Sequence, residues 1–187
     1  VKEHGKNDDI WMKLVDGRVL RSGVGSSWGQ PNIWNSNVRD YIQNYCATQS
    51  RYFCDDPSLL CYDYAGEPHP YGMSPEPGQP QYSGYNDSAV AAFREFLTRK
   101  FKSIDALNRA WKSSYSGFEA IGPPPDPYMT HPEKATPLSY EFELFRCRSH
   151  TDYWKLVYDA YRKHDARKPI EAHASMYMSG WPAQAMD

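Results

Sequence analysis

The feature that most constrains the fold of this chain is a short apolar run at residues 59–64, followed at once by a loop rich in glycine and proline. A run of this length without polar alternation is typical of a parallel strand that is covered on both faces. A second strand is predicted at residues 170–176, and the long segment between the two has helical periodicity. Strands separated by helices pair in parallel through right-handed crossovers, so the sequence predicts the α/β class.

Four helices are predicted from the spacing of apolar residues and from capping residues. The predicted ranges are residues 37–53 after Ser36, residues 88–102, a short helix after Ser103, and residues 138–164. Tyr41, Tyr45 and Tyr52 share the spacing of the buried positions in the first helix, and Tyr140 and Tyr158 do so in the last. These tyrosines are therefore assigned to buried faces, and the helical tryptophans Trp111 and Trp154 to helix packing.

A hairpin is predicted near the start of the chain, where residues 11–15 run into Asp16-Gly17 and out through residues 18–20. An Asp-Gly pair at this place favours a type I′ turn.

Charge and composition narrow the classes of partner. The net charge is −2, and acidic and basic residues are interleaved, which gives no surface for nucleic acid or for an anionic membrane. No stretch has the roughly 20 apolar residues of a membrane helix. The chain begins at Val1 and ends at Asp187, both ends are expected to be cuts within a longer domain, and no compartment is predicted.

The four cysteines are scattered and include no CxxC pair, which argues against a zinc site within this segment. Free, mostly buried thiols are expected. A disulfide between Cys46 and Cys54 stays open as an alternative.

Glu67 is the residue that best suits chemistry. It comes directly after the first predicted strand and is flanked by Gly66 and Pro68. Loops after the carboxyl ends of parallel strands gather on one face, where barrel enzymes hold their active sites. A carboxyl group in aromatic surroundings has a raised pKa and can donate a proton, but a lone glutamate after a strand is more often only a loop or cap residue.

Several segments resemble glycoside hydrolases. Residues 60–68 (LCYDYAGEP) resemble the fourth strand of clan A enzymes, which ends in an Asn-Glu pair whose glutamate is the general acid/base. Residues 92–97 (AFREFL), 101–111 (FKSIDALNRAW) and 140–146 (YEFELFR) resemble glycoside hydrolase family 42, the β-galactosidase-like group. The resemblance implies a partial (β/α)8 TIM barrel, from roughly the third to the fifth strand with their helices. A complete barrel needs about 250 residues, so residues 1–187 are expected to be one incomplete catalytic domain.

The chain departs from the family pattern at two places. Gly66 stands where the clan has asparagine, whose amide contacts the sugar 2-hydroxyl in the transition state. The cysteine cluster that binds zinc in some members is replaced by residues 85–88 (YNDS). No metal and no cofactor are therefore implied.

The resemblance implies a retaining mechanism with Glu67 as general acid/base. The nucleophile would be a second carboxylate after the seventh strand, beyond this chain. Glu171 lies within the last predicted strand and is a poor substitute, because strand alternation makes it a barrel-wall or outward-facing residue.

Five further residues are candidates for binding a carbohydrate substrate. His69 and His173 could hydrogen-bond the sugar or orient Glu67, although a histidine in such a place is as often structural. Trp28, Trp34 and Tyr71 could stack on sugar rings, although such aromatics are more often core, and Trp28 is the best of the three.

The leading hypothesis is a retaining glycoside hydrolase that cleaves terminal β-galactosides or related glycosides. The alternative is a non-catalytic carbohydrate-binding barrel that has lost hydrolysis, and a third hypothesis is a structural domain without a sugar site. The fragment alone is expected to be inactive and to aggregate, because an open barrel leaves strand edges and apolar helix faces uncovered. The sequence predicts no oligomeric state.

Overall fold

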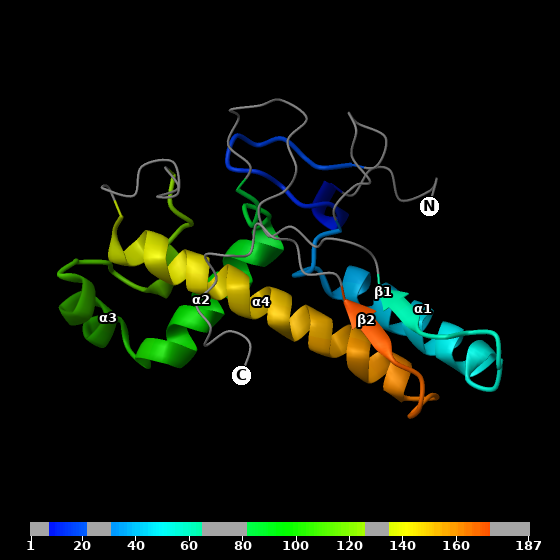
Figure 1. Ribbon diagram of the computed structural model, residues 1–187. Helices are drawn as coiled ribbons and strands as arrows, with labels where there is room; N and C mark the ends of the chain where they lie inside the picture. The colour runs from blue at the N-terminus through cyan, green and yellow to red at the C-terminus, as the bar shows by residue number, and fades with distance from the viewer. Residues whose placement is uncertain (1–7, 22–30, 65–81, 126–134, 173–187) are drawn as a thin grey trace.

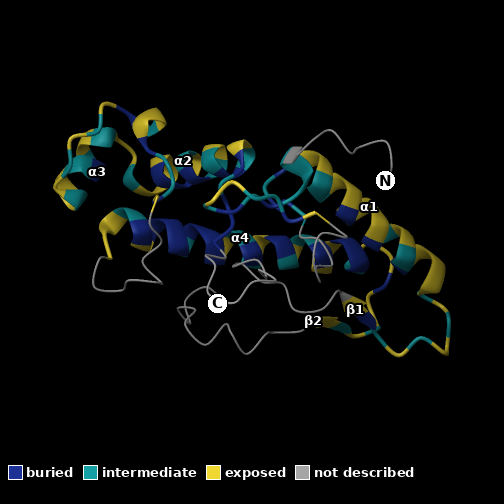
Figure 2. Ribbon diagram, turned by 90° about the horizontal axis from the view of Figure 1, so that it is seen from above, coloured by how far each residue is buried: buried dark blue, intermediate teal, exposed yellow. Residues whose placement is uncertain are grey.

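The computed structural model describes residues 8–21, 31–64, 82–125 and 135–172, in which helices pack beside a small parallel sheet (Figure 1). The elements in chain order are η1 (Asp8–Ile10), α1 (Ser36–Phe53), β1 (Tyr62–Tyr64), α2 (Asp87–Phe101), α3 (Ile104–Trp111), η2 (Phe118–Ala120), α4 (Pro137–Arg162) and β2 (Ile170–Ala172). Helices α1 and α4 lie side by side and run in the same direction, with β1 and β2 along one side of the pair (Figures 1 and 2).

The two strands pair in parallel, as predicted. Tyr62 lies opposite Ile170, and Tyr64 lies opposite Ala172. Strand β1 is shorter than the predicted run, because the chain joins the sheet only at Tyr62; Leu60 precedes the strand and is 83% exposed. Residues 173–176 of the second predicted strand lie outside the described residues.

The helices begin where polar side chains can bind the first free backbone N–H groups. The Asn35 side chain accepts hydrogen bonds from the N–H groups of Asn37 and Val38, so the cap of α1 is one residue earlier than predicted. Ser103 caps α3, as predicted, by accepting a hydrogen bond from the N–H of Ala106. The predicted helix ranges are confirmed to within two residues at each end.

Two clusters of buried side chains form the core, and α4 contributes to both. The first joins α1, β1 and the carboxyl-terminal half of α4, with Ile42, Cys46, Val157 and Tyr161 among its members. The second joins α2, α3 and the amino-terminal half of α4 around the fully buried Phe93. The long helix α4 therefore connects the strand pair to the α2–α3 unit, as the band of buried residues along it in Figure 2 shows.

The predicted burial is wrong for five helical tyrosines. Tyr41, Tyr45 and Tyr52 are 65%, 51% and 77% exposed, and Tyr140 and Tyr158 are exposed as well. The predicted burial of Ile42, Cys46 and Tyr161 is confirmed. The buried face of α1, with Ile42, Cys46 and Ser50, is rotated by about 100° from the tyrosines. Trp111 and Trp154 are partly buried against the core clusters, as predicted.

The hairpin near the start of the chain forms with a different turn from the predicted one. The N–H of Leu14 donates to the carbonyl of Arg18, and that of Gly17 donates to the carbonyl of Leu14. Gly17 has a φ of 86°, but Asp16 does not have a positive φ. A type I′ turn needs positive φ at both central residues, so this is a three-residue loop with a left-handed glycine at its end.

A buried polar contact closes the amino-terminal edge of the strand pair. The Tyr62 hydroxyl donates to Oδ2 of Asp165 at 2.9 Å, and the rings of Tyr62 and Tyr161 stack with centroids 4.5 Å apart. Oδ1 of Asp165 accepts hydrogen bonds from the N–H groups of Arg167 and Lys168. Asp165 therefore fixes the turn from α4 to β2 against β1.

This contact predicts a pH dependence of stability. Burial alone would raise the pKa of Asp165, but hydrogen bonds from Arg167, Lys168 and Tyr62 outweigh burial and lower the pKa to about 2. A carboxyl group with a lowered folded-state pKa stabilises the fold above its unfolded pKa, near 4, and loses this contribution as the pH falls toward 2.

We therefore expect Asp165→Asn to lower the free energy of unfolding at neutral pH, and the difference from wild type to shrink as the pH falls below about 4. Urea denaturation at a series of pH values measures both effects. Asp159→Asn is the control, because Asp159 forms only an exposed ion pair with Lys155. A difference that stays constant down to about pH 2 would contradict the assignment.

None of the described helices combines the length and the apolar composition that crossing a membrane requires.

Candidate active site

The strand pair has one carboxyl-terminal edge, and two segments that carry predicted site residues follow it in the sequence. Because Tyr64 lies opposite Ala172, both strands end at the same edge. Along the chain, Glu67 follows Tyr64 by three residues and His173 follows Ala172 directly. Five of the predicted site residues lie outside the described residues: Glu67, Trp28, His69, Tyr71 and His173. Their positions as site residues stay predictions. Trp34, the remaining stacking candidate, is instead packed against the core, where its ring stacks on that of Phe145 with centroids 5.6 Å apart.

One face of the strand pair carries two carboxylates. Tyr62 is buried toward the helices, so strand alternation directs Asp63 to the opposite face. Glu171 is the register partner of Asp63 and shares this face; both residues are exposed. The thiol of Cys61 donates to Oε2 of Glu171 at 3.9 Å. Glu171 thus has the exposed strand position that was expected from the sequence. The exposed position of Asp63 beside it was not predicted, although strand alternation applies to Asp63 in the same way.

The segment that leads into α2 is paired with the hairpin near the start of the chain. The N–H of Val15 donates to the carbonyl of Tyr82 at 2.9 Å, and Leu14 and Ser83 form an antiparallel bridge. Asn86 continues the pairing with its side chain, which accepts from the N–H of Lys13 and donates to the carbonyl of Trp11. The segment is therefore tied to the hairpin at several successive positions.

Gly84 lets this segment approach the helices closely. Its φ is +102°, and a Cβ added there would lie 3.2 Å from Cζ of Phe142 and 3.4 Å from Cη2 of Trp34. Both the backbone conformation and the space therefore favour glycine.

We expect Gly84→Ala to lower the free energy of unfolding by about 2–3 kcal/mol, from left-handed strain and overpacking together. Two control variants separate these causes. Gly17 has a φ of +86° with no atom within 4 Å, so Gly17→Ala should show the strain alone. Gly122 has neither feature, so Gly122→Ala should change stability little. Equal losses for Gly84→Ala and Gly17→Ala in urea denaturation would rule out the steric contribution.

A charged pair is buried in α4 next to Tyr82, the first residue of this segment. Nη1 of Arg146 lies 3.0 Å from Oε2 of Glu143, and the Arg146 side chain is 0% exposed. The guanidinium carbon of Arg146 lies 5.4 Å from the centre of the Tyr82 ring. Sequence analysis did not single out this pair, because a Glu-Arg pair spaced by three residues is typical of an exposed helix face.

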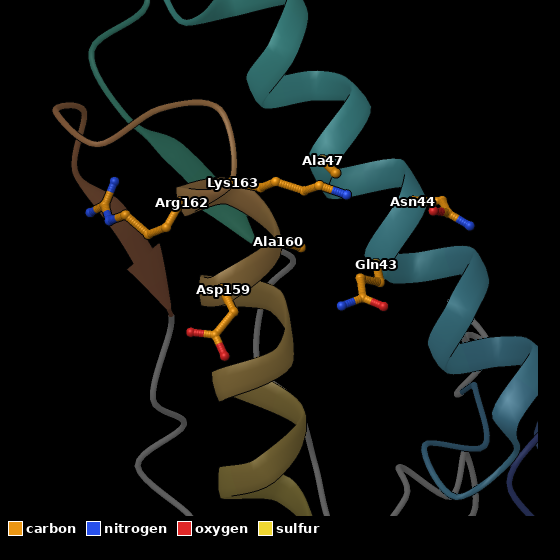
Figure 3. Close-up of a pocket in the computed structure, with 7 residues that line it drawn as sticks. All are labelled: Gln43, Asn44, Ala47, Asp159, Ala160, Arg162 and Lys163. Atoms are coloured by element: carbon orange, nitrogen blue, oxygen red, sulfur yellow. The ribbon is translucent and has the colours of Figure 1, made fainter.

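The described residues include a surface cavity between α1 and α4 and another beside β2. A cavity of about 370 Å³ lies between α1 and α4, where Lys163 reaches toward Ala47 and Arg162 points away from α1 (Figure 3). Arg162 already donates to the carbonyls of Asp165 and Lys168. A cavity of about 420 Å³ beside β2 is mainly apolar, with Trp154 and Ile170 in its lining. Charged side chains line both cavities: Asp159 and Lys163 in the first, and Lys155 and Glu171 in the second.

The cysteines do not form a metal site or a disulfide within the described residues. All four are free, so the Cys46–Cys54 disulfide left open by the sequence is not formed. Burial, and then the neighbouring Glu143, raise the pKa of Cys147 to about 12, which keeps this thiol protonated. Among the residues that the structure describes, no group of histidine, cysteine and acidic side chains could hold a metal ion.

Comparison with known proteins identifies the family. Residues 33–187 match the family model of glycoside hydrolase family 42, described as β-galactosidase. A β-amylase of Niallia circulans is 34% identical over 65% of this chain and 22% of its own length. The β-galactosidase BbgII of Bifidobacterium bifidum is 26% identical over the same shares, 65% and 22%. The chain thus spans 22% of the length of these relatives.

Solved structures establish the fold. The β-galactosidase from the psychrophilic Marinomonas ef1 has a TM-score of 0.70 at 23% identity, over 92% of this chain and 24% of that one. The catalytic domain of a β-amylase from Paenibacillus polymyxa has a TM-score of 0.71 at 19% identity, over 92% and 43%. The parallel strands and their helices are therefore part of a (β/α)8 barrel of the glycoside hydrolase type, as predicted. The chain belongs to glycoside hydrolase family 42.

Proposed function

We propose that this chain supplies the general acid/base of a retaining glycoside hydrolase that cleaves terminal β-galactosides or related glycosides. The observation that carries the proposal is the parallel pairing of β1 with β2 in a family 42 chain, because it gives both strands a common carboxyl-terminal edge. Glu67 follows β1 by three residues along the sequence. In this role Glu67 protonates the departing glycosidic oxygen and then activates a water molecule.

The rest of the site is proposed on the same grounds. His69 and His173 bind sugar hydroxyls or orient Glu67, and Trp28 and Tyr71 stack on the sugar rings. A retaining enzyme needs a second carboxylate about 5–5.5 Å from the first, to act as nucleophile. We propose that residues 1–187 are an incomplete catalytic domain, that is, one part of a (β/α)8 barrel. We propose that the nucleophile lies outside these residues.

The stereochemistry of the product tests the mechanism. The full-length protein is incubated with β-galactosides, and proton NMR records the anomer that is released first. A retaining enzyme releases the β-anomer before mutarotation, and an inverting enzyme releases the α-anomer. Release of the α-anomer would exclude the retaining mechanism, and no turnover of any β-galactoside would argue against this substrate class.

The comparisons favour a second candidate function, the hydrolysis of starch-like α-glucans. The relative with 34% identity is a β-amylase, and the β-amylase catalytic domain has a TM-score of 0.71. Incubation with amylose beside the β-galactosides separates the two activities. Release of reducing sugar from amylose alone would favour the amylase function.

A non-catalytic carbohydrate-binding barrel is the outcome to test if no substrate turns over. Gly66, in place of the asparagine of clan A, motivates this alternative. Isothermal titration would then measure sugar binding by the wild type and by Glu67→Ala. Binding that survives the substitution, without turnover, would support a binding role.

We expect the isolated 187-residue chain to be inactive and to aggregate. Tyr41, Tyr45 and Tyr52 form an exposed aromatic stripe on α1, on the side turned away from the α4-facing residues Gln43 and Ala47. Exposed aromatic stripes of this kind associate unless another element covers them. Size-exclusion chromatography measures the outcome, and a monomeric peak with a cooperative thermal transition would contradict it.

A further inference from the structure

The cavity beside β2 is an apolar groove with an exposed aromatic ring. Its volume is about 420 Å³, and its apolar lining consists of Trp154, Val157, Tyr158 and Ile170. Tyr158 is 47% exposed, and the guanidinium carbon of Arg162 lies 4.8 Å from the centre of its ring. The ring is therefore packed against Arg162 and is still open to solvent.

The groove lies on the flank of α4 that is turned away from α1. Ala160 lines the cavity between α1 and α4, and Tyr158 precedes Ala160 by two residues, which is about 200° around the helix. Trp154 lies about one turn before Tyr158, so both aromatic side chains point to the far flank. The described residues that line the groove all belong to α4 or to β2. Within the described part of the chain, the groove therefore has a floor and one side.

The same chain shows how a groove of this kind is filled one unit earlier. Helix α1 precedes β1, and α4 follows β1 in the sequence. Helix α4 packs beside α1 and against β1, where the rings of Tyr161 and Tyr62 stack with centroids 4.5 Å apart. Helix α4 in turn precedes β2. In a (β/α)8 barrel each strand is followed by a helix of the outer ring, so consecutive units repeat the same packing. The helix that follows β2 thus has the same relation to α4 and β2 as α4 has to α1 and β1.

We propose that the groove formed by Trp154, Tyr158 and Ile170 binds the helix that follows β2 in the full-length protein. That helix presents an apolar stripe to the two aromatic rings and polar residues to the rim, where Lys155 and Glu171 lie. The groove is then an internal contact of the barrel and not a sugar site, because barrel enzymes bind their substrates at the carboxyl-terminal face. The inference rests on the barrel fold and does not require the proposed activity.

Photo-crosslinking in the full-length protein identifies the occupant of the groove. The photoreactive residue p-benzoylphenylalanine, in place of Tyr158, reacts on irradiation with C–H bonds that touch it. We expect a crosslink within one chain, from position 158 to a peptide that follows residue 172, identified by peptide mass spectrometry. A product of twice the chain mass would assign the groove to a second copy and overturn the proposal. A crosslink to a peptide before residue 137, or no crosslink at all, would overturn it as well.

Hydroxyl-radical labelling of the unmodified full-length protein gives an independent measure. Tyr140 is the matched control, because it lies on the same helix, is 57% exposed, and belongs to the half of α4 that packs against α2 and α3. We expect Tyr158 to be labelled about 10-fold more slowly than Tyr140, because a covered ring reacts only when the covering helix opens locally. Equal labelling rates would overturn the proposal. Equal rates that fall at Tyr158 alone when amylose or a β-galactoside is added would make the groove a sugar site instead.

The outcome is separable from that of the proposed function, because hydrolysis is measured on the same protein. A crosslink beyond residue 172 in a protein that hydrolyses no glycoside would support the helix contact and count against the activity. A crosslink between two copies in a protein that hydrolyses β-galactosides would overturn the helix contact and leave the activity standing.

Discussion

Replacement of Glu67 by alanine is expected to reduce kcat/KM for an alkyl β-galactoside by about 1,000-fold in the full-length protein, because general acid catalysis contributes about 10²- to 10⁴-fold. For an aryl glycoside with a good leaving group, the first step needs little protonation, so the glycosyl-enzyme forms and then reacts slowly with water. Added azide, which needs no general base, should restore turnover by attacking this intermediate. Steady-state kinetics with and without azide measure both effects.

Glu76→Ala is the matched control, because it removes the same side chain from the same loop of the sequence. It should leave the kinetics with both substrates near those of wild type. If Glu67→Ala retained wild-type activity on the alkyl glycoside, or if Glu76→Ala showed the azide rescue instead, Glu67 would not be the acid/base.

Truncation of Phe93 is expected to have the largest effect on stability. Phe93 is 0% exposed, and its ring centre lies 5.1 Å from that of Phe142 and 5.3 Å from that of Phe145. Phe93→Ala removes these contacts and leaves a cavity between α2 and α4, which typically costs about 3–5 kcal/mol. Urea denaturation measures the change in the free energy of unfolding.

Two comparisons make this test specific. Phe93→Leu keeps most of the volume and should cost about 1.5 kcal/mol or less. Tyr140→Ala truncates an aromatic residue on α4 that is 57% exposed, and it should change stability by less than about 0.5 kcal/mol. Similar losses for Phe93→Ala and Tyr140→Ala would mean that the α2–α4 contact is not the source of the stability.

The helix boundaries could be predicted because they depend on local chemistry. Ser103 binds the N–H of Ala106 whatever surrounds it, and Thr136 with Ser139 forms a capping box in front of α4. The parallel pairing of the strands could be predicted as well, since helices between two strands leave few other topologies. The order of the elements along the chain is enough for this second prediction, and local sequence is enough for the first.

The exposure of the tyrosines on α1 could not be predicted, because tyrosine is common both in the interior and on the surface of proteins. Periodicity alone predicted that Tyr41 and Tyr45 are buried together with Ile42. In the structure, the contacts with α4 and β1 bury Ile42 and Cys46 and leave the tyrosines exposed. The burial of Arg146 and Glu143 was not predicted either. Charged residues with helical spacing are expected on an exposed helix face, and it is the packing of other elements around α4 that buries this pair.

The pairing of β1 with β2 also has a consequence for the order of folding. Tyr62 and Ile170 are more than 100 residues apart in the sequence, and the two strands have three residues each. Contacts over such a separation form slowly, because the entropy of closing the loop is lost before the contact forms. The contacts between α2 and α3 are local and can form early, so the sheet edge that holds the proposed catalytic residue should be among the last parts of the chain to assemble during refolding.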